Sequence, residues 1–177
     1  MIYYQENDLR IRSMIETDIV FFADAFLQLG WDDRQATLAQ YFAEQNNAAR
    51  IVLVAEWGDA PVGYVTLLPC AEEGPFAGQG LPEIKDFNVL PPFRRRGIGN
   101  RLMDCAEALA KEQSEYVTLA VGMYAGYGSA QRMYVKRGYI PDGSGLWYCA
   151  KQLKPYEDCR NDDDLNLYFS KRLAAFP

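Results

Sequence analysis

The chain has 177 residues, of which 49% are apolar, so it can build one well-packed core but is short for two ordinary domains. Its net charge of −6 argues against a nucleic-acid binder that relies on phosphate contacts, and it favours cationic partners such as amines. The chain contains no histidine, which excludes Ser-His-Asp and Cys-His nucleophile pairs as well as histidine-bound zinc and haem.

The first half of the chain predicts a strand, two helices and a β-hairpin. We expect a strand at 9–12, helices at 17–30 and 32–44, strands at 51–57 and 62–68, and a loop at 70–80. Thr17 is a suitable N-cap for the first helix, and Gly30 is suited to end it. The dipeptide Gly58-Asp59 between two apolar runs is typical of a hairpin turn.

The second half of the chain alternates strands and helices. We expect strands at 83–90 and 116–121, helices at 98–110 and 129–137, a strand beginning at 139, an exposed excursion at 151–164 and a final strand through Leu165, Leu167 and Phe169. The whole order predicts a single mixed α/β domain over residues 1–177, in which antiparallel strands precede a strand-helix-strand-helix-strand series.

The cysteines and the start of the chain bear on its cellular location. Four cysteines form no Cys-x-x-Cys pair, so we expect no metal site. The sequence shows no secretory signal and no apolar run that could span a membrane. We therefore expect a cytoplasmic protein with reduced cysteines, most of them in the core.

The segment Pro92–Asn100 predicts a phosphate site where a strand meets an amphipathic helix. Gly97 and Gly99 let the backbone approach a ligand closely, and the N–H groups at a helix start attract anions. Three consecutive arginines (Arg94, Arg95 and Arg96) add positive charge. A dinucleotide fingerprint does not fit, because Leu102 stands where a third glycine is required, and no Gly-Lys-Ser/Thr of a Walker loop is present.

Two motifs resemble the GNAT superfamily of N-acetyltransferases. Arg94–Gly99 is similar to the family's Gln/Arg-x-x-Gly-x-Gly/Ala motif, and Ala130–Tyr139 is similar to its Ala-x-x-x-Tyr-x-x-x-Gly-Phe/Tyr helix. The order of the expected elements also matches over nearly the whole chain. The resemblance implies a mostly antiparallel sheet of about seven strands, splayed at strands 4 and 5, with helices on both faces and acetyl-CoA in the gap.

The resemblance also implies which residues hold acetyl-CoA. Backbone N–H groups of Arg95–Asn100 would hold the pyrophosphate, and the strand edge at Phe87 would pair with pantetheine and polarise the acetyl carbonyl. The family often has asparagine seven residues before Tyr134, where this chain has Tyr127, and Ser129 would be the polar contact in its place. The complete set of expected cofactor-binding residues is Phe87, Asn88, Val89, Arg94, Arg95, Arg96, Gly97, Ile98, Gly99, Asn100 and Ser129.

Two side chains are candidates for the chemistry. Tyr134 matches the family tyrosine that protonates the departing CoA thiolate, and a phenol keeps its proton at working pH. An alkylamine has a pKa of about 10, so a base or a dry pocket must deliver it neutral. Glu83, at the spacing of the strand-four glutamate, is the expected base, and Asp86 on the opposite face is the reserve.

The sequence therefore predicts direct acetyl transfer from acetyl-CoA to a primary amine of a small molecule or peptide. No metal, nucleic acid or membrane is expected to take part, and a homodimer is left open. One alternative is a non-catalytic acyl-CoA-binding or sensing module on the same fold, which would not depend on Tyr134 for its function. Another is an unrelated anion-binding regulatory domain, which would not prefer CoA over phosphate.

Overall fold

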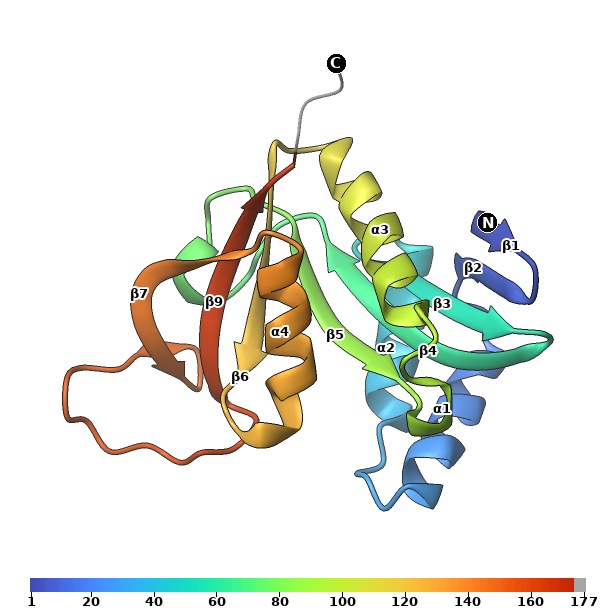
Figure 1. Ribbon diagram of the computed structural model, residues 1–177, viewed down its shortest axis with the longest axis horizontal. Coiled ribbons are helices and arrows are strands. Elements are labelled where there is room, and N and C mark those ends of the chain that lie inside the picture. The colour runs from blue at the N-terminus through green and yellow to red at the C-terminus, as the bar shows by residue number, and fades with distance from the viewer. Residues whose placement is uncertain (174–177) are drawn as a thin grey trace. The chain divides into compact units, whose positions relative to one another are not determined.

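The computed structural model describes residues 1–173, and the last four residues of the expected domain lie outside them. The helices and strands, labelled in Figure 1, are β1 (Ile2–Glu6), β2 (Leu9–Ser13), α1 (Thr17–Gln28), α2 (Gln35–Asn46), β3 (Ile51–Trp57), β4 (Ala60–Leu68), η1 (Gly74–Phe76), β5 (Glu83–Val89), η2 (Pro91–Phe93), α3 (Ile98–Lys111), β6 (Tyr116–Gly122), η3 (Ala125–Tyr127), α4 (Gly128–Lys136), β7 (Ile140–Tyr148), β8 (Lys151–Gln152) and β9 (Leu165–Arg172).

The mixed α/β fold expected from the sequence is confirmed. Across the described residues, nine strands form one sheet in the order β1-β2-β3-β4-β5-β6-β9-β7-β8, in which β5 and β6 are parallel. The chain divides into two compact units. Unit 1 comprises residues 1–68 and 86–109, and unit 2 comprises residues 69–85 together with the chain from 110 onward.

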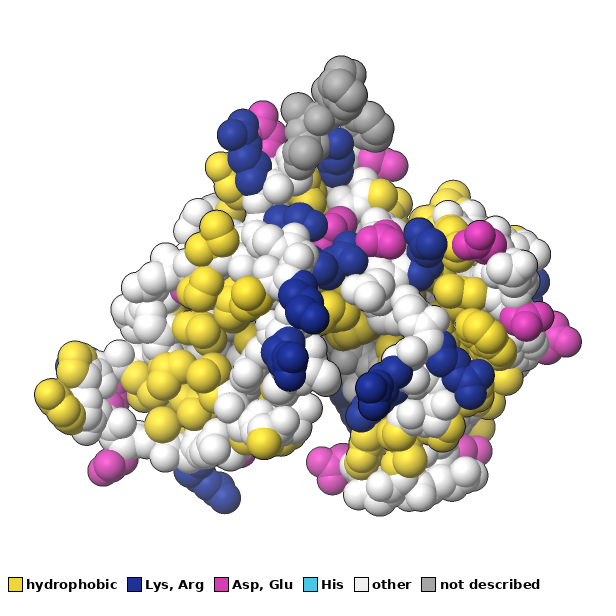
Figure 2. Space-filling model, viewed as in Figure 1, with side chains coloured by type: hydrophobic (Ala, Val, Ile, Leu, Met, Phe, Trp, Pro, Cys, Tyr) yellow, Lys and Arg dark blue, Asp and Glu magenta, His cyan; other side chains and the backbone are white. Residues whose placement is uncertain are grey.

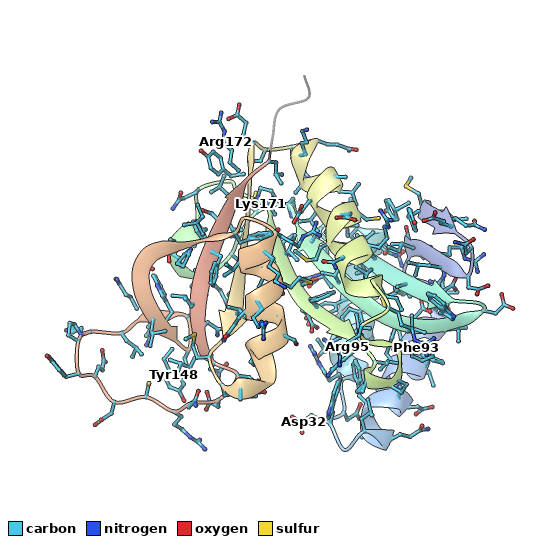
Figure 3. The ribbon with its side chains drawn as sticks, viewed as in Figure 1. Asp32, Phe93, Arg95, Tyr148, Lys171 and Arg172 are labelled. Atoms are coloured by element: carbon cyan, nitrogen blue, oxygen red, sulfur yellow. The ribbon has the colours of Figure 1, made fainter. Side chains whose placement is uncertain are left out.

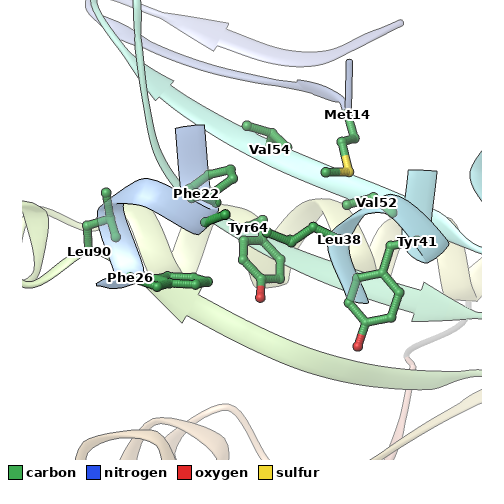
Figure 4. Packing of buried hydrophobic residues seen from close by; sticks show 10 residues of the cluster. Met14, Phe22, Phe26, Leu38, Tyr41, Val52, Val54, Tyr64 and Leu90 are labelled. Atoms are coloured by element: carbon green, nitrogen blue, oxygen red, sulfur yellow. The ribbon is translucent and has the colours of Figure 1, made fainter. Parts of the chain in front are cut away.

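Unit 1 is built on the antiparallel ladder of β1, β2, β3 and β4. Helices α1 and α2 cover one face of these strands, and α3 lies on the other face (Figure 1). The core below α1 and α2 is aromatic, and the ring of Tyr64 lies 5.1 Å from that of Phe22. Figure 4 shows the buried side chains of this cluster, which are Met14, Phe22, Ala23, Phe26, Leu38, Tyr41, Val52, Val54, Tyr64 and Leu90.

Unit 2 is built around β6, β9 and β7, which pair antiparallel. The first residues of β5, Glu83 and Ile84, pair in parallel with β6. A small cluster of Ala71, Phe76 and Tyr168 packs beside these strands. Figure 2 shows hydrophobic side chains over β7, where Ile140 remains exposed.

Three expectations need correction. The chain has an additional strand at its start, because β1 pairs with β2 around a turn at Asn7, which has a φ of +50°. Thr17 is the first residue of α1 and not its cap, since Glu16 holds the N-cap position without a side-chain hydrogen bond. The cysteines do not mostly fill the core, because three of the four free thiols are exposed.

Within residues 1–173, no helix combines the length and the apolar character needed to cross a membrane.

Candidate functional site

The loop before α3 has an unusual backbone. Arg95 has a φ of +64° and Gly97 has a φ of +82°, so two left-handed residues alternate with ordinary ones just before the helix. Such an alternation turns successive N–H groups toward one point and forms an anion-binding nest. The first helical hydrogen bond runs from the Arg101 N–H to the Gly97 carbonyl at 3.1 Å. The N–H groups of Ile98 and Gly99 precede this bond in the first turn, so the helix offers them no carbonyl and they can face an anion.

The arginines of this loop have different environments. Arg94 donates from Nε to the Val89 carbonyl at 2.8 Å. Arg96 lies 5.6 Å from the ring of Trp57 and 5.5 Å from that of Phe93, so two cation–π contacts hold it. Arg95 makes no such contact within the described residues and is exposed. Figure 3 labels Phe93 and Arg95 on the loop, and Figure 2 shows basic side chains gathered over it.

The two glycines of the motif are required for different reasons. A Cβ on Gly97 would meet no atom within 4 Å, so the positive φ and the open space in front of the nest explain this glycine. A Cβ on Gly99 would lie 2.9 Å from the tip of the Phe87 ring. Gly99 therefore lets Phe87 pack on the start of α3, and unit 1 brings Phe87 together with the loop that follows β5.

Asp86 is the centre of a polar cluster in unit 1 that the sequence did not reveal. Arg34 binds both carboxylate oxygens of Asp86, at 2.9 and 2.7 Å. Tyr64 donates its hydroxyl hydrogen to Asp86 at 3.0 Å, and the Asn88 amide donates at 2.8 Å. The side chain of Asn88 is thus committed to contacts within the protein.

Tyr41 and Tyr64, the two tyrosines close to Asp86, keep their protons. Burial, together with the negative charge of Asp86, raises the pKa of Tyr41 to about 12 and raises the pKa of Tyr64 well above its usual value. Figure 4 shows both hydroxyls pointing to the same side of the core. The cluster is therefore a carboxylate held by neutral and cationic donors.

The two expected catalytic side chains lie in unit 2. Tyr134 on α4 is 5% exposed, and its ring lies 5.7 Å from that of Tyr139. Burial raises the pKa of Tyr134, so the phenol remains protonated at neutral pH. Glu83 is 3% exposed, and its charge adds to the effect of burial in raising the pKa of Tyr168 to about 12. Tyr168 is therefore a neighbour of Glu83 that sequence spacing could not indicate.

The structure also shows the surroundings of Tyr127, which stands where the family motif often has asparagine. The hydroxyls of Tyr127 and Tyr124 both donate to one oxygen of Asp163, at 2.6 and 2.8 Å. The ring of Tyr127 lies against Gly122, where a Cβ would come within 2.3 Å of it. Ser129 is exposed in the first turn of α4, so its hydroxyl is accessible.

Among the described residues, no group of three or more His, Cys, Asp or Glu side chains is arranged to hold a metal ion. The side chains singled out above offer proton donors and acceptors, and the backbone before α3 offers an anion nest. The nest of unit 1 suits an anion such as a phosphate, and unit 2 separately holds a buried phenol and a buried carboxylate.

Comparison with known proteins agrees with this chemistry. The family model described as the acetyltransferase (GNAT) family matches residues 14–139. The chain belongs to the GNAT acetyltransferase family. No curated protein matches its sequence.

Solved structures of other GNAT-type proteins share the fold. An acetyltransferase of the GNAT family from Desulfovibrio desulfuricans is 14% identical with a TM-score of 0.70, covering 94% of this chain and 99% of that chain. A Salmonella typhimurium acetyltransferase, solved with acetyl-CoA, is 16% identical with a TM-score of 0.66 and 96% of each chain covered. Arabidopsis thaliana Naa50, solved with the bisubstrate analogue CoA-Ac-MVNAL, is 16% identical with a TM-score of 0.61, covering 94% and 99%.

Proposed function

We propose that this protein is an acetyl-CoA-dependent N-acetyltransferase that acetylates a primary amine of a small molecule or peptide in the cytoplasm. The observation that carries the proposal is the nest before α3, in which left-handed Arg95 and Gly97 precede a helix N-terminus. Within the matched GNAT family, such a loop suits the pyrophosphate of CoA. Arg95 supplies a full positive charge beside it.

The bound acetyl-CoA supplies a thioester whose acetyl carbon accepts an amine. The backbone N–H groups of Arg95–Asn100 hold the pyrophosphate, and the Phe87–Val89 edge binds the pantetheine amides. The Phe87 N–H donates to the acetyl carbonyl. The Tyr134 hydroxyl, kept protonated by burial, gives its proton to the departing thiolate. Glu83 takes the proton of the acceptor amine, and Ser129 contacts the cofactor.

The net charge of the chain and the substrates of similar proteins indicate which acceptor amines to test. The net charge of −6 favours a cationic amine over an anionic substrate. Arabidopsis Naa50 was solved with an analogue that joins CoA to a peptide, and RimL is a ribosomal L7/L12 α-N-protein acetyltransferase. A panel of peptide N-termini, polyamines and aminoglycosides therefore covers the acceptor classes to be tested first.

Calorimetric titration with acetyl-CoA, CoA and inorganic phosphate tests the cofactor site without an acceptor. The Gly97→Ala variant places a Cβ in the open space of the nest and disfavours its φ of +82°. We expect acetyl-CoA affinity to fall about tenfold, which corresponds to losing about one charge-assisted hydrogen bond.

Gly30→Ala is the matched control, because Gly30 also has a positive φ of +73° and open space around its Cβ position. Both variants should lose similar stability, and only Gly97→Ala should lose affinity. If acetyl-CoA bound no better than phosphate, or if the two variants behaved alike, the proposed function would be refuted.

A further inference from the structure

The middle of β5 contains a residue with an unusual backbone. Asp86 has a φ of +50°, in the left-handed region that residues with a Cβ seldom enter, and it lies inside a strand. Strained residues of this kind persist only where surrounding contacts over-determine them, and they concentrate at functional sites. Asp86 therefore needs an explanation beyond its place in a sheet.

The contacts that hold Asp86 are strong and directional. Arg34 forms two parallel hydrogen bonds with its carboxylate, and Tyr64 and Asn88 add one each. A bidentate arginine–carboxylate pair fixes orientation as well as distance. All the hydrogen bonds end on one side chain, so they fix the rotation of the strained residue.

Arg34 is itself fixed by the helix that follows it. It is the N-cap residue of α2, and its carbonyl accepts from the Leu38 N–H at 2.9 Å in the first turn. Leu38 is fully buried in the core of unit 1. The backbone of Arg34 is thus anchored at the start of α2, and its guanidinium is held by Asp86.

The strained residue determines where the next peptide group points. Side chains and N–H groups alternate direction along a regular strand, and one left-handed residue breaks that alternation. The peptide that joins Asp86 to Phe87 carries the N–H that the proposed function assigns to the acetyl carbonyl. Rotation at Asp86 therefore moves this hydrogen-bond donor directly.

We propose that Arg34 is a positioning residue for acetyl transfer, which acts through Asp86 to aim the Phe87 N–H at the acetyl carbonyl. The inference rests on the proposed function and names a residue from outside both sequence motifs. It also assigns Asp86 a role other than general base, because both of its carboxylate oxygens already accept hydrogen bonds from Arg34, Tyr64 or Asn88. Oxyanion donors act by being held in place before the reaction, which requires a support of this kind.

The test compares acetyl-CoA with S-ethyl-CoA, a thioether of similar size that lacks the carbonyl. We expect wild type to bind acetyl-CoA about fivefold more tightly than S-ethyl-CoA, the ratio that one net hydrogen bond provides. In Arg34→Gln this preference should disappear while S-ethyl-CoA affinity stays close to wild type. Asp86→Ala should behave in the same way, and Asp86→Asn, which tolerates the left-handed backbone, should retain part of the preference.

Isotope-edited infrared spectroscopy of bound acetyl-CoA labelled with ¹³C at the carbonyl gives a second readout. The wild-type carbonyl stretch should lie lower than in water, and Arg34→Gln should move it back. The matched control is Arg10→Gln, which breaks another arginine–carboxylate pair in unit 1, with Glu56, while Arg12 remains bound to that carboxylate. This folded control should keep both the preference and the carbonyl shift.

The outcomes separate the two proposals. A folded Arg34→Gln variant with unchanged preference and carbonyl frequency overturns the positioning role and leaves the acetyltransferase proposal standing. Failure of the wild type to bind either CoA derivative refutes the proposed function and the positioning role together.

Discussion

Arg12 connects three parts of unit 1, and its removal should be among the most destabilising single changes in the chain. Its guanidinium donates to both oxygens of Asp18, at 2.7 and 2.8 Å, and to Glu56 at 2.6 Å. Asp18 is 1% exposed and Glu56 is 5% exposed. Arg12→Met would therefore leave the buried carboxylate of Asp18 without its cation and leave Glu56 with Arg10 alone.

The magnitude follows from that burial. Removing one partner of a buried ion pair typically costs about 3–5 kcal/mol, because the remaining charge is left without compensation. The control is Arg172→Met, which breaks the pair with Glu115 at 3.4 Å, where both side chains are more than two-thirds exposed (70% and 74%). An exposed pair contributes about 0–1 kcal/mol, so the control should barely change the free energy of unfolding.

The loss of stability in Arg12→Met should depend on pH, in a direction set by the pKa of Glu56. Burial acts to raise the pKa of Glu56, but hydrogen bonds from Arg10 and Arg12 outweigh it, and the pKa is lowered. A lowered pKa stabilises the fold above the ordinary value of about 4.3, and this stabilisation is lost as the pH falls through the folded value. The gap between wild type and Arg12→Met should thus be widest near neutral pH and narrow on acidification below pH ~4.

Urea denaturation of both variants at neutral and acidic pH measures this gap. A loss below about 1 kcal/mol at neutral pH, or a gap that does not narrow in acid, would show that the Arg12 network is not the buried electrostatic support inferred here.

Three further predictions concern single positions. Tyr134→Phe should lower kcat about 100-fold with the best acceptor of the amine panel while leaving acetyl-CoA affinity unchanged. An unchanged kcat would indicate that another group protonates the thiolate, and the absence of turnover in wild type would favour a binding module. Glu83→Gln should flatten the acidic limb of the kcat/KM pH profile, whereas Asp86→Asn should keep that limb; the reverse result would make Asp86 the base. Gly74→Ala should lower the free energy of unfolding by about 2 kcal/mol or more, because its Cβ would lie 2.2 Å from the Tyr168 ring at a φ of +71°. The control Gly78→Ala, which has a φ of +74° and open space around its Cβ, should lose only about 1 kcal/mol in the same thermal or urea melts.

Features set by neighbouring residues were accessible from the sequence. The hairpin at Gly58-Asp59, the strand before Pro91 and the amphipathic helix α3 all lie where local patterns predicted them. The phosphate-binding interpretation rested on the same kind of local information, since the nest is formed by residues adjacent in the chain. The strand β1 was missed because Tyr3 and Tyr4 break the alternation that marks a half-buried strand.

Features set by distant residues were not accessible. Arg34 and Asp86 are 52 residues apart, and nothing in their local surroundings indicates that they pair. The electrostatic influence of Glu83 on Tyr168 likewise depends on the sheet order, which places β9 beside β6. A side chain's partners depend on tertiary packing, so local periodicity identifies an element but not the residues that its polar groups meet.

The glycine in the middle of β4 and the left-handed aspartate in β5 belong to one structural feature. A Cβ on Gly63 would lie 2.6 Å from the Asn88 carbonyl oxygen and 3.0 Å from the Val89 Cα, so β5 approaches β4 too closely there for any larger residue. The Leu90 N–H donates to the Val62 carbonyl at 2.9 Å, which fixes the register directly after this approach. Glycine normally weakens a strand, and here it permits the close contact that follows the break in alternation at Asp86. Position 63 should therefore tolerate no larger residue unless β5 shifts away from β4, which makes β4 a structural support for the strand whose Phe87 N–H is proposed to bind the acetyl carbonyl.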